Sequence, residues 1–208
     1  MHKKSFKTLV FILMYYYAQM AFCQTTDLTH VIHERVEHFP LVNPDIKDLQ
    51  ELQKAFGSHT KKELASALIA DLDVDRKVPW KNHSRNFAVG RLYKALGLPP
   101  VIVCQELEKE QSPQRKVRLM AVLWGLKTPE VTTALVHQLK DRRSAEEYIG
   151  DPEEPVEALR VCDVASNTLN HNFDPNGYAR RISFSSSDDR RDEIIKATLK
   201  ELKLDGQQ

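Results

Sequence analysis

Glycine and cysteine are both scarce in this chain. Seven glycines among 208 residues are few for the many tight turns of a β-sandwich or β-barrel, whereas leucine, alanine, lysine and glutamate, which favour helices, are abundant. Of the three cysteines, only Cys104 and Cys162 lie beyond the N-terminal apolar stretch, which excludes a disulfide-rich scaffold. The composition therefore predicts an all-α fold that is stabilised by an apolar core.

An excess of charge of either sign is also lacking. The chain has 30 basic and 29 acidic residues, and the two signs are interspersed along its length. A protein that binds nucleic acid usually concentrates lysine and arginine in a patch or stripe, and no such cluster stands out here. We therefore expect no nucleic-acid partner.

The first 23 residues have the layout of a secretory signal peptide. Three lysines precede a continuous apolar and aromatic stretch over residues 8–22, and no acidic residue interrupts it. This stretch is shorter than the roughly 20 apolar residues that span a membrane. We expect cleavage before Gln24, export to the periplasm or beyond, and no membrane span in the mature chain. The alternative is a chain that stays membrane-anchored through its N-terminus.

Signals for helix boundaries are frequent from residue 43 onward. Residues 60–63 have the spacing of a capping box, and Ser112 and Thr128 each precede a proline, which is favoured at the first helical position. Ser84 is likewise expected to cap a helix. These signals divide the chain into a partly ordered N-terminal arm at 24–42, one helical domain at 43–204 and a frayed tail at 205–208.

Residues 117–126 are expected to form the centre of the core. Two apolar stripes run along this segment at helical spacing, and a helix that is apolar nearly all round must be covered on several sides. Trp124 belongs to one of the stripes. We therefore expect its side chain to be buried.

Two segments, 86–110 and 116–141, echo each other at an offset of about 30 residues. Each reads as a helix, a turn marked by proline and a second helix. In this region, over roughly residues 84–170, the chain resembles HEAT-repeat and HEAT-like proteins. The residues that fit their pattern are Arg118, Leu126, Pro129, Leu139 and Asp141. The resemblance implies a short HEAT-like helical-repeat solenoid with a binding or scaffolding role and no chemistry; an irregular helical bundle is the alternative.

Potential metal ligands lack the spacing of known metal sites. His33 and His38 are five residues apart, whereas the zinc-protease helix needs a separation of four. Residues 71–75 alternate aspartate as a calcium loop does, but Arg76 stands where that loop requires glycine. We expect a solvated arm around the histidines and a charged loop over 71–80. No metal, cofactor or catalytic residue is predicted.

The polar, proline-bearing loop at residues 142–155 is the predicted partner-binding surface. Its candidate residues are Arg142, Arg143, Glu146, Glu147, Tyr148 and Glu154. Tyr148 is the expected anchor because aromatic residues contribute disproportionately to interfaces. An inert solvated insertion accounts for the loop equally well.

We thus expect an exported, non-catalytic protein-interaction or scaffold module with an unknown protein partner. The alternative is an exported enzyme, or an enzyme accessory, whose catalytic residues are dispersed in the sequence and meet only in the fold.

Overall fold

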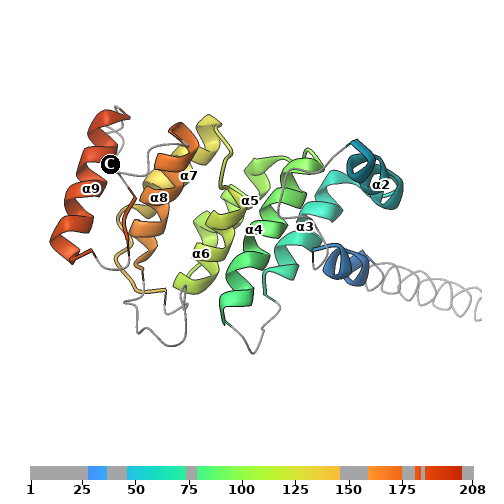
Figure 1. The fold of residues 1–208 in the computed structure, drawn as a ribbon, viewed down its shortest axis with the longest axis horizontal. Coiled ribbons are helices and arrows are strands. Elements are labelled where there is room, and N and C mark those ends of the chain that lie inside the picture. Colours follow the sequence, from blue (N-terminus) through green and yellow to red (C-terminus); the bar gives the residue numbers. More distant parts are fainter. Residues whose placement is uncertain are drawn as a thin grey trace, which may run out of the picture.

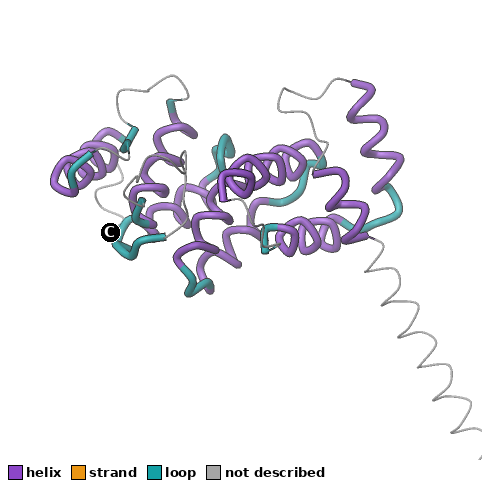
Figure 2. Tube along the Cα trace, turned by 60° about the horizontal axis from the view of Figure 1, so that its bottom comes forward, coloured by secondary structure: helices purple, strands orange, loops and turns teal. Residues whose placement is uncertain are grey.

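The computed structural model of the chain describes residues 28–36, 46–73, 79–145, 159–174, 181–183 and 186–202. Within these ranges the chain is helical apart from turns and connections, and it contains no strand beyond one isolated antiparallel bridge between Ser144 and Arg160 (Figure 2). The all-α class is therefore confirmed for the described residues. None of the helices described is both long and apolar enough to cross a membrane.

A helical segment at 28–36 comes first. The helices that follow are α2 (Ile46–Phe56), α3 (Lys61–Asp71), α4 (Pro79–Ala95), α5 (Pro100–Lys109), α6 (Pro113–Val122), α7 (Pro129–Gln138), α8 (Val161–Phe173) and α9 (Asp188–Glu201). They succeed one another along the long axis of the molecule, with α2 near one end and α9 at the other (Figure 1). α4 packs against α6 and α6 against α8, while α5 packs against α7. Alternate helices in the sequence are thus neighbours in space.

Most of the predicted helix starts are confirmed. Both hydrogen bonds of the capping box are present at Thr60, and the hydroxyls of Ser112 and Thr128 each accept a hydrogen bond from a backbone amide in the first turn of α6 and α7. The prediction that Ser84 caps a helix is wrong. It lies inside α4, which begins at Pro79, because proline at a first helical position is a strong start signal of its own.

The central core segment is shorter than predicted. α6 ends at Val122, and Gly125 adopts a φ of 78°, a left-handed conformation that glycine reaches without steric cost. This turn redirects the chain directly after Leu123, the last fully buried residue of the segment, so Trp124 is only partly buried. The expectation that Trp124 is a core residue is therefore wrong.

The predicted N-terminal arm contains an unexpected helix at 28–36. Leu28, Ile32 and Val36 recur every four residues and are all buried, and Ile32 is fully so. This helix joins the common hydrophobic core. The predicted signal peptide and the predicted C-terminal tail lie outside the described residues.

α4 and α6 approach each other to backbone contact at Gly90. A β-carbon at this position would lie 2.8 Å from the carbonyl oxygen of Ala121 and 3.1 Å from the Cα of Val122. Only glycine allows this approach without displacing a helix. The contact brings the C-terminal ends of α4 and α6 side by side.

Candidate functional site

Trp124, just beyond the end of α6, is held by side chains from three other segments. Its indole ring stacks on the ring of His171 with 4.4 Å between centroids, and the ring of Phe87 stands perpendicular to it at 5.5 Å. The guanidinium of Arg181 lies over the indole, 5.6 Å from its centroid. The ammonium of Lys94 donates a hydrogen bond of 2.9 Å to the backbone carbonyl of Trp124. These five residues are hereafter the Trp124 patch.

The backbone under the indole is fixed by Asn172, which is buried in α8. Its side-chain oxygen accepts a 2.6 Å hydrogen bond from the amide of Gly125, and its nitrogen donates to the carbonyls of Leu123 and Leu126 at 3.2 and 2.8 Å. One buried amide thus satisfies three polar groups of the turn. The position of Trp124 is therefore set by α8 as well as by α6.

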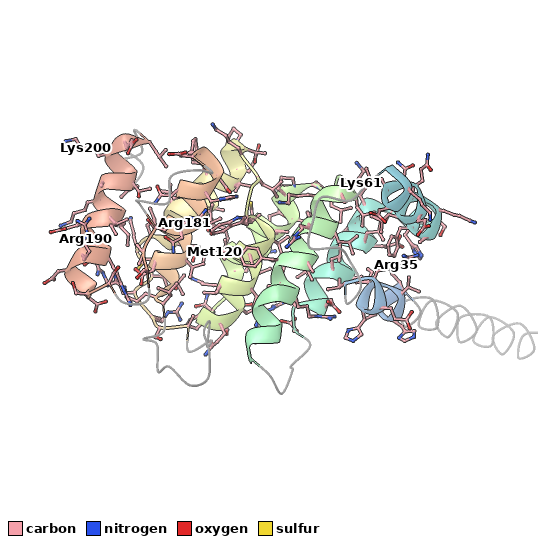
Figure 3. All side chains as sticks on the ribbon, viewed as in Figure 1. Arg35, Lys61, Met120, Arg181, Arg190 and Lys200 are labelled. Carbon is pink, nitrogen blue, oxygen red and sulfur yellow. The ribbon has the colours of Figure 1, made fainter. Side chains whose placement is uncertain are left out.

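Arg181 is positioned by its neighbour Ile182. The backbone amide of Ile182 donates to the side-chain oxygen of Asn167 at 2.7 Å, and the side-chain nitrogen of Asn167 donates back to the Ile182 carbonyl at 3.0 Å. The side chain of Ile182 is itself buried. These contacts fix residues 181–183 against α8, and Figure 3 labels Arg181 beside that helix.

Positive charges crowd the patch. The pKa of His171 is lowered by burial first, and then by the charges of Arg181 and Lys94. The guanidinium of Arg181 lies 3.3 Å from Nδ1 of His171, and because a guanidinium can only donate, Nδ1 is the acceptor and the ring proton belongs on Nε2. The pKa of Lys94 is lowered as well, by burial and then by Arg91. The charges that act on these two groups are all cations.

A second cation–aromatic pair is formed by residues that follow Trp124 and His171 in the sequence. The ammonium of Lys127 lies over the ring of Phe173, 4.7 Å from its centroid. Lys127 follows Trp124 by three residues, and Phe173 follows His171 by two. Within the described residues, the ammoniums of Lys94 and Lys127 contact a carbonyl and an aromatic ring, and neither is paired with a carboxylate.

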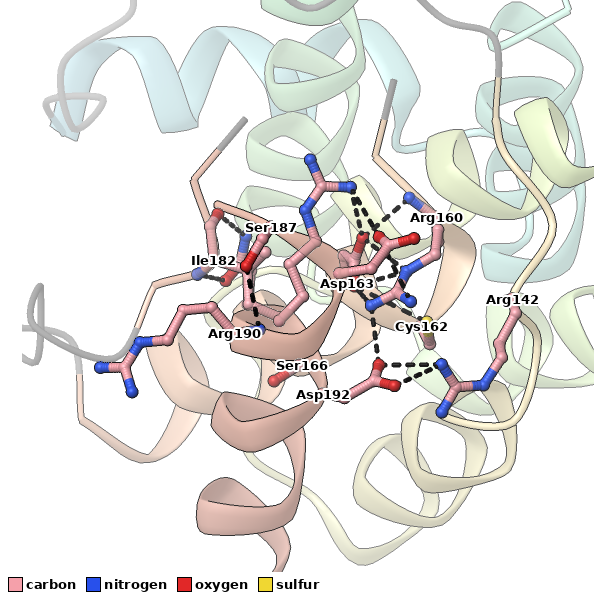
Figure 4. Close-up of polar contacts among 12 residues, drawn as sticks. Arg142, Arg160, Cys162, Asp163, Ser166, Ile182, Ser187, Arg190 and Asp192 are labelled. Atoms are coloured by element: carbon pink, nitrogen blue, oxygen red, sulfur yellow. Dashed lines mark hydrogen bonds and ion pairs between the residues drawn. The ribbon is translucent and has the colours of Figure 1, made fainter. Parts of the chain in front are cut away.

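Buried charges gather at the opposite, N-terminal end of α8 (Figure 4). Asp163 accepts hydrogen bonds of 2.8 to 3.2 Å from the backbone and side chain of Arg160, and Arg191 of α9 lies 3.4 Å away. Asp192 pairs with Arg160 at 2.9 Å and with Arg142 at 2.6 Å. The residues of this Asp163 network are Arg142, Arg160, Asp163, Asp188, Arg191 and Asp192.

The Asp163 network is balanced, with three arginines and three aspartates. The pKa of Arg160 is raised, chiefly by its hydrogen bonds to Asp163. Burial alone would raise the pKa of Asp192, but hydrogen bonds from Arg142 and Arg160 outweigh this effect and lower it. Because each charge has an opposite partner, we assign the network the structural role of holding α9 and the segment before α8 onto α8.

Two of the predicted partner-binding residues form intramolecular ion pairs. Arg142 pairs with Asp192 in the Asp163 network, and Arg143 pairs with Asp141 at 2.6 Å and donates to the carbonyl of Gln111 at 2.8 Å. Both side chains are still at least half exposed, and both tie the base of the loop to the helices. The other predicted residues, Glu146, Glu147, Tyr148 and Glu154, lie outside the described residues.

His33 and Asp71 do not occupy the solvated segments predicted for them. Asp71 is the last residue of α3 and is 1% exposed, so the prediction that it begins an exposed loop is wrong. Arg85 of α4 pairs with Asp71, and Nδ1 of His33 lies 2.7 Å from the guanidinium of Arg85 and 3.1 Å from Asp71. This cluster ties the 28–36 helix to α3 and α4. In the part of the chain that is described, no three histidine, cysteine, aspartate or glutamate side chains are grouped so as to hold a metal ion.

Cys104 and Cys162 are buried, unpaired thiols. Burial raises the pKa of Cys104 to about 11 and that of Cys162 to about 12. Thiolates are the reactive form of cysteine, so neither residue has the character of a nucleophile.

Sequence reasoning missed the Trp124 patch. Phe87 and Lys94 lie on α4, His171 lies on α8 and Arg181 lies beyond the end of α8, so no local spacing joins them to Trp124. The available signal was the sequence Trp124-Gly125, because a glycine after a large aromatic can end a helix and leave the ring at a surface.

Comparisons of the chain with family models, with curated proteins and with solved structures found no match in any of the three. The proposal of a function therefore rests on the geometry described above.

Proposed function

We propose that this chain is a non-catalytic protein-interaction or scaffold module whose helix pairs stack as a short HEAT-like solenoid. The packing of α4 on α6, α6 on α8 and α5 on α7 supports this arrangement. So does the ion pair of 2.9 Å between Lys116 at the start of α6 and Asp141 just after α7, which joins the two ends of one helix pair. Stacked helix pairs offer an extended surface that is suited to binding proteins.

The observation that carries the proposal is the partly exposed, rigidly held indole of Trp124. Tryptophan is among the residues that contribute most to interface energy. A side chain that is already fixed loses little conformational freedom on binding, which favours association further. The geometry therefore supports an interaction surface around Trp124.

Export is part of the same proposal. Its support is the sequence of the first 23 residues, in which lysines precede an uninterrupted apolar stretch. Intact-mass measurement of the exported protein should give a chain that begins at or near Gln24. A soluble product that keeps Met1 would contradict export by this route, and a product that stays in the membrane fraction would favour the N-terminal anchor.

The test of the interaction is crosslinking and affinity recovery from cells that produce the protein, using the Trp124→Ala variant. We expect a partner that the unmodified protein captures to be lost. The matched control is Val101→Ala, since Val101 is an exposed apolar side chain on α5, a helix that contributes no residue to the patch, and its variant should recover the partner normally. Equal recovery by all three proteins would contradict the proposal.

The predicted loop and the enzyme alternative can be tested with the same material. Replacing residues 144–153 by a Gly/Ser linker should abolish recovery only if the loop contacts the partner. Turnover of a substrate by the purified protein would overturn the non-catalytic function.

A further inference from the structure

Each ring nitrogen of His171 lies on the side of a different cation. Nδ1 lies 3.3 Å from the guanidinium of Arg181. On the side of Nε2, a β-carbon at Gly125 would lie 4.0 Å from this nitrogen and 3.1 Å from the ammonium of Lys94, so both groups border Gly125. The imidazole is thus placed between a guanidinium and an ammonium.

The contact with Arg181 requires a neutral imidazole. A guanidinium can only donate, and Nδ1 of His171 can accept only while it carries no proton. In the protonated ring both nitrogens are donors. Protonation of His171 would therefore replace the hydrogen bond by two facing donors of like charge.

The indole of Trp124 contacts both of these side chains. The imidazole of His171 stacks on it with 4.4 Å between centroids and 21° between planes, and the guanidinium of Arg181 lies over it at 5.6 Å. A protonated imidazole would itself be a cation on the indole, and it would repel the guanidinium. The neighbouring residue Ile182 is held by Asn167 and not by His171, so the side chain of Arg181 can move while the backbone after it stays on α8.

We propose that Arg181 is a pH-controlled cover of the Trp124 indole: neutral His171 holds the guanidinium over the ring, and protonation of His171 expels it. This inference rests on the proposed function and deepens it, because it states how the access of a partner to the indole is regulated. At neutral pH a partner has to displace the guanidinium from the indole. In acid the indole is already uncovered.

The charged groups around His171 agree with this direction. Arg181 faces it from the segment after α8 and Lys94 from α4, whereas the turn after α6 contributes the uncharged indole of Trp124. Asp174, the first residue after α8, is not among the charges that act on His171. Burial, then Arg181 and then Lys94 lower its pKa, so the neutral ring that holds the cover is the form present at neutral pH.

The experiment measures quenching of Trp124 fluorescence by acrylamide between pH 8 and pH 5, in a chain whose other tryptophan is replaced by Trp80→Phe. Quenching should increase as the pH falls, with the midpoint at which the ring protons of His171 titrate in NMR spectra. This midpoint should lie below 6.5. Circular dichroism verifies that the chain stays folded over this range. Constant quenching, or a midpoint that differs from that of His171, would overturn the proposal.

Two variants in the same background separate the cover from its control. Arg181→Gln removes the guanidinium, so at pH 8 its quenching should equal that of the parent chain in acid. His171→Gln keeps a side-chain oxygen that can accept from Arg181 but does not titrate, so its quenching should not change with pH. A pH dependence in His171→Gln equal to that of the parent chain would contradict the role of His171.

The matched control variant is His137→Gln. His137 also lies in the last turn of its helix, α7, but its Nδ1 is 2.8 Å from the carboxylate of Glu108 and not beside a guanidinium. Its variant should keep the pH dependence of Trp124 quenching. If His137→Gln abolishes this dependence as His171→Gln does, the change is not local to the patch and the proposal is wrong.

Partner capture connects the cover to the proposed function. At pH 8, Arg181→Gln should bind the partner that the unmodified protein captures about 2- to 5-fold more tightly, since no cation–aromatic contact has to be displaced. Equal binding by the two proteins would overturn the proposed regulation. If quenching is independent of pH while Trp124→Ala loses the partner, the proposed function stands and the cover is wrong. If quenching follows His171 while Trp124→Ala still captures the partner, the cover stands and the proposed function is wrong.

Discussion

The two ends of α8 carry charge in opposite ways. At its N-terminal end, Asp163 is fully buried and is surrounded by arginines whose charges are cancelled by aspartates. At its C-terminal end, His171 and Trp124 are partly exposed, and the charges around them are cations. One helix thus has a buried cluster of paired charges at one end and a partly exposed aromatic cluster at the other.

The difference separates a structural cluster from a candidate binding surface. A buried ion pair stabilises a fold only when its desolvation is repaid by good geometry, and once formed it has no capacity for a ligand. Charged and aromatic groups near solvent cost little desolvation and stay accessible to a partner. Both ends are rich in polar residues, and it is the exposure of the side chains that distinguishes them.

Disrupting the Asp163 network should have the largest effect on the free energy of unfolding. Asp163→Ala leaves the buried guanidiniums of Arg160 and Arg191 without their shared carboxylate, and we expect a loss of about 3–5 kcal/mol in the free energy of unfolding. Urea denaturation measures it. The control is Asp188→Ala, because this aspartate is 71% exposed, and its loss should stay below about 1 kcal/mol. Similar losses for the two variants would mean that Asp163 is not the centre of the network.

Disrupting the Trp124 patch should reduce the free energy of unfolding by a smaller amount. Trp124→Ala removes the ring contacts with His171 and Phe87 but creates no closed cavity, because the indole is partly exposed. We expect a loss of about 1–3 kcal/mol, below the range for a fully buried tryptophan. A loss equal to that of Asp163→Ala would place the indole in the core and remove the contrast between the two ends.

The pH dependence of stability sharpens the same contrast. The pKa of His171 in the folded chain lies below its ordinary value of 6.5, so as the pH falls through 6.5 the unfolded chain binds a proton first. The stabilising effect of the neutral ring is therefore present above pH 6.5 and is lost as the pH falls below it. Urea midpoints measured between pH 5 and pH 8 should fall less steeply toward acid for His171→Gln than for the unmodified chain. A steeper fall in the variant would contradict the sign of the pKa shift.

The smallest expected effect is on the alkylation of the two buried cysteines. It measures how far the Asp163 network excludes a reagent from Cys162. Cys162 is fully buried next to Asp163, whereas Cys104 lies in α5 and is 6% exposed. Alkylation by iodoacetamide at pH 8 should leave both thiols unmodified in the native state and should modify both in denaturant. In Asp163→Ala, Cys162 should react before Cys104. Equal rates in that variant would show that the network does not control access to Cys162.

Much of the fold followed from local chemistry in the sequence. Thr60, Ser112 and Thr128 marked helix starts because a capping side chain acts on amides three residues away. The 28–36 helix was missed because its buried face has only three apolar residues, Leu28, Ile32 and Val36, among histidines and acids. Such a helix gains its stability from docking and not from its own pattern.

The candidate site could not be derived in the same way. Trp124 belonged to an apolar stripe, and the stripe predicted burial correctly as far as Leu123. Its exposure depends on the left-handed turn at Gly125, which Asn172 holds from a helix nearly 50 residues later in the chain. A tertiary hydrogen bond of this kind has no signature in local sequence.

The backbone contact at Gly90 has a consequence for how the molecule tolerates change. Any side chain there would have to displace the main chain of Ala121 or Val122. The close spacing of α4 and α6 therefore depends on Gly90 having no β-carbon. Substitutions elsewhere along these helices can be accommodated by repacking of side chains, but a substitution at Gly90 would push the two helices apart. Lys94 lies four residues after Gly90 on α4, so this displacement would move its ammonium away from the carbonyl of Trp124. Surface residues around this contact can therefore change while the spacing between the ends of α4 and α6 stays constant, provided that residue 90 remains glycine.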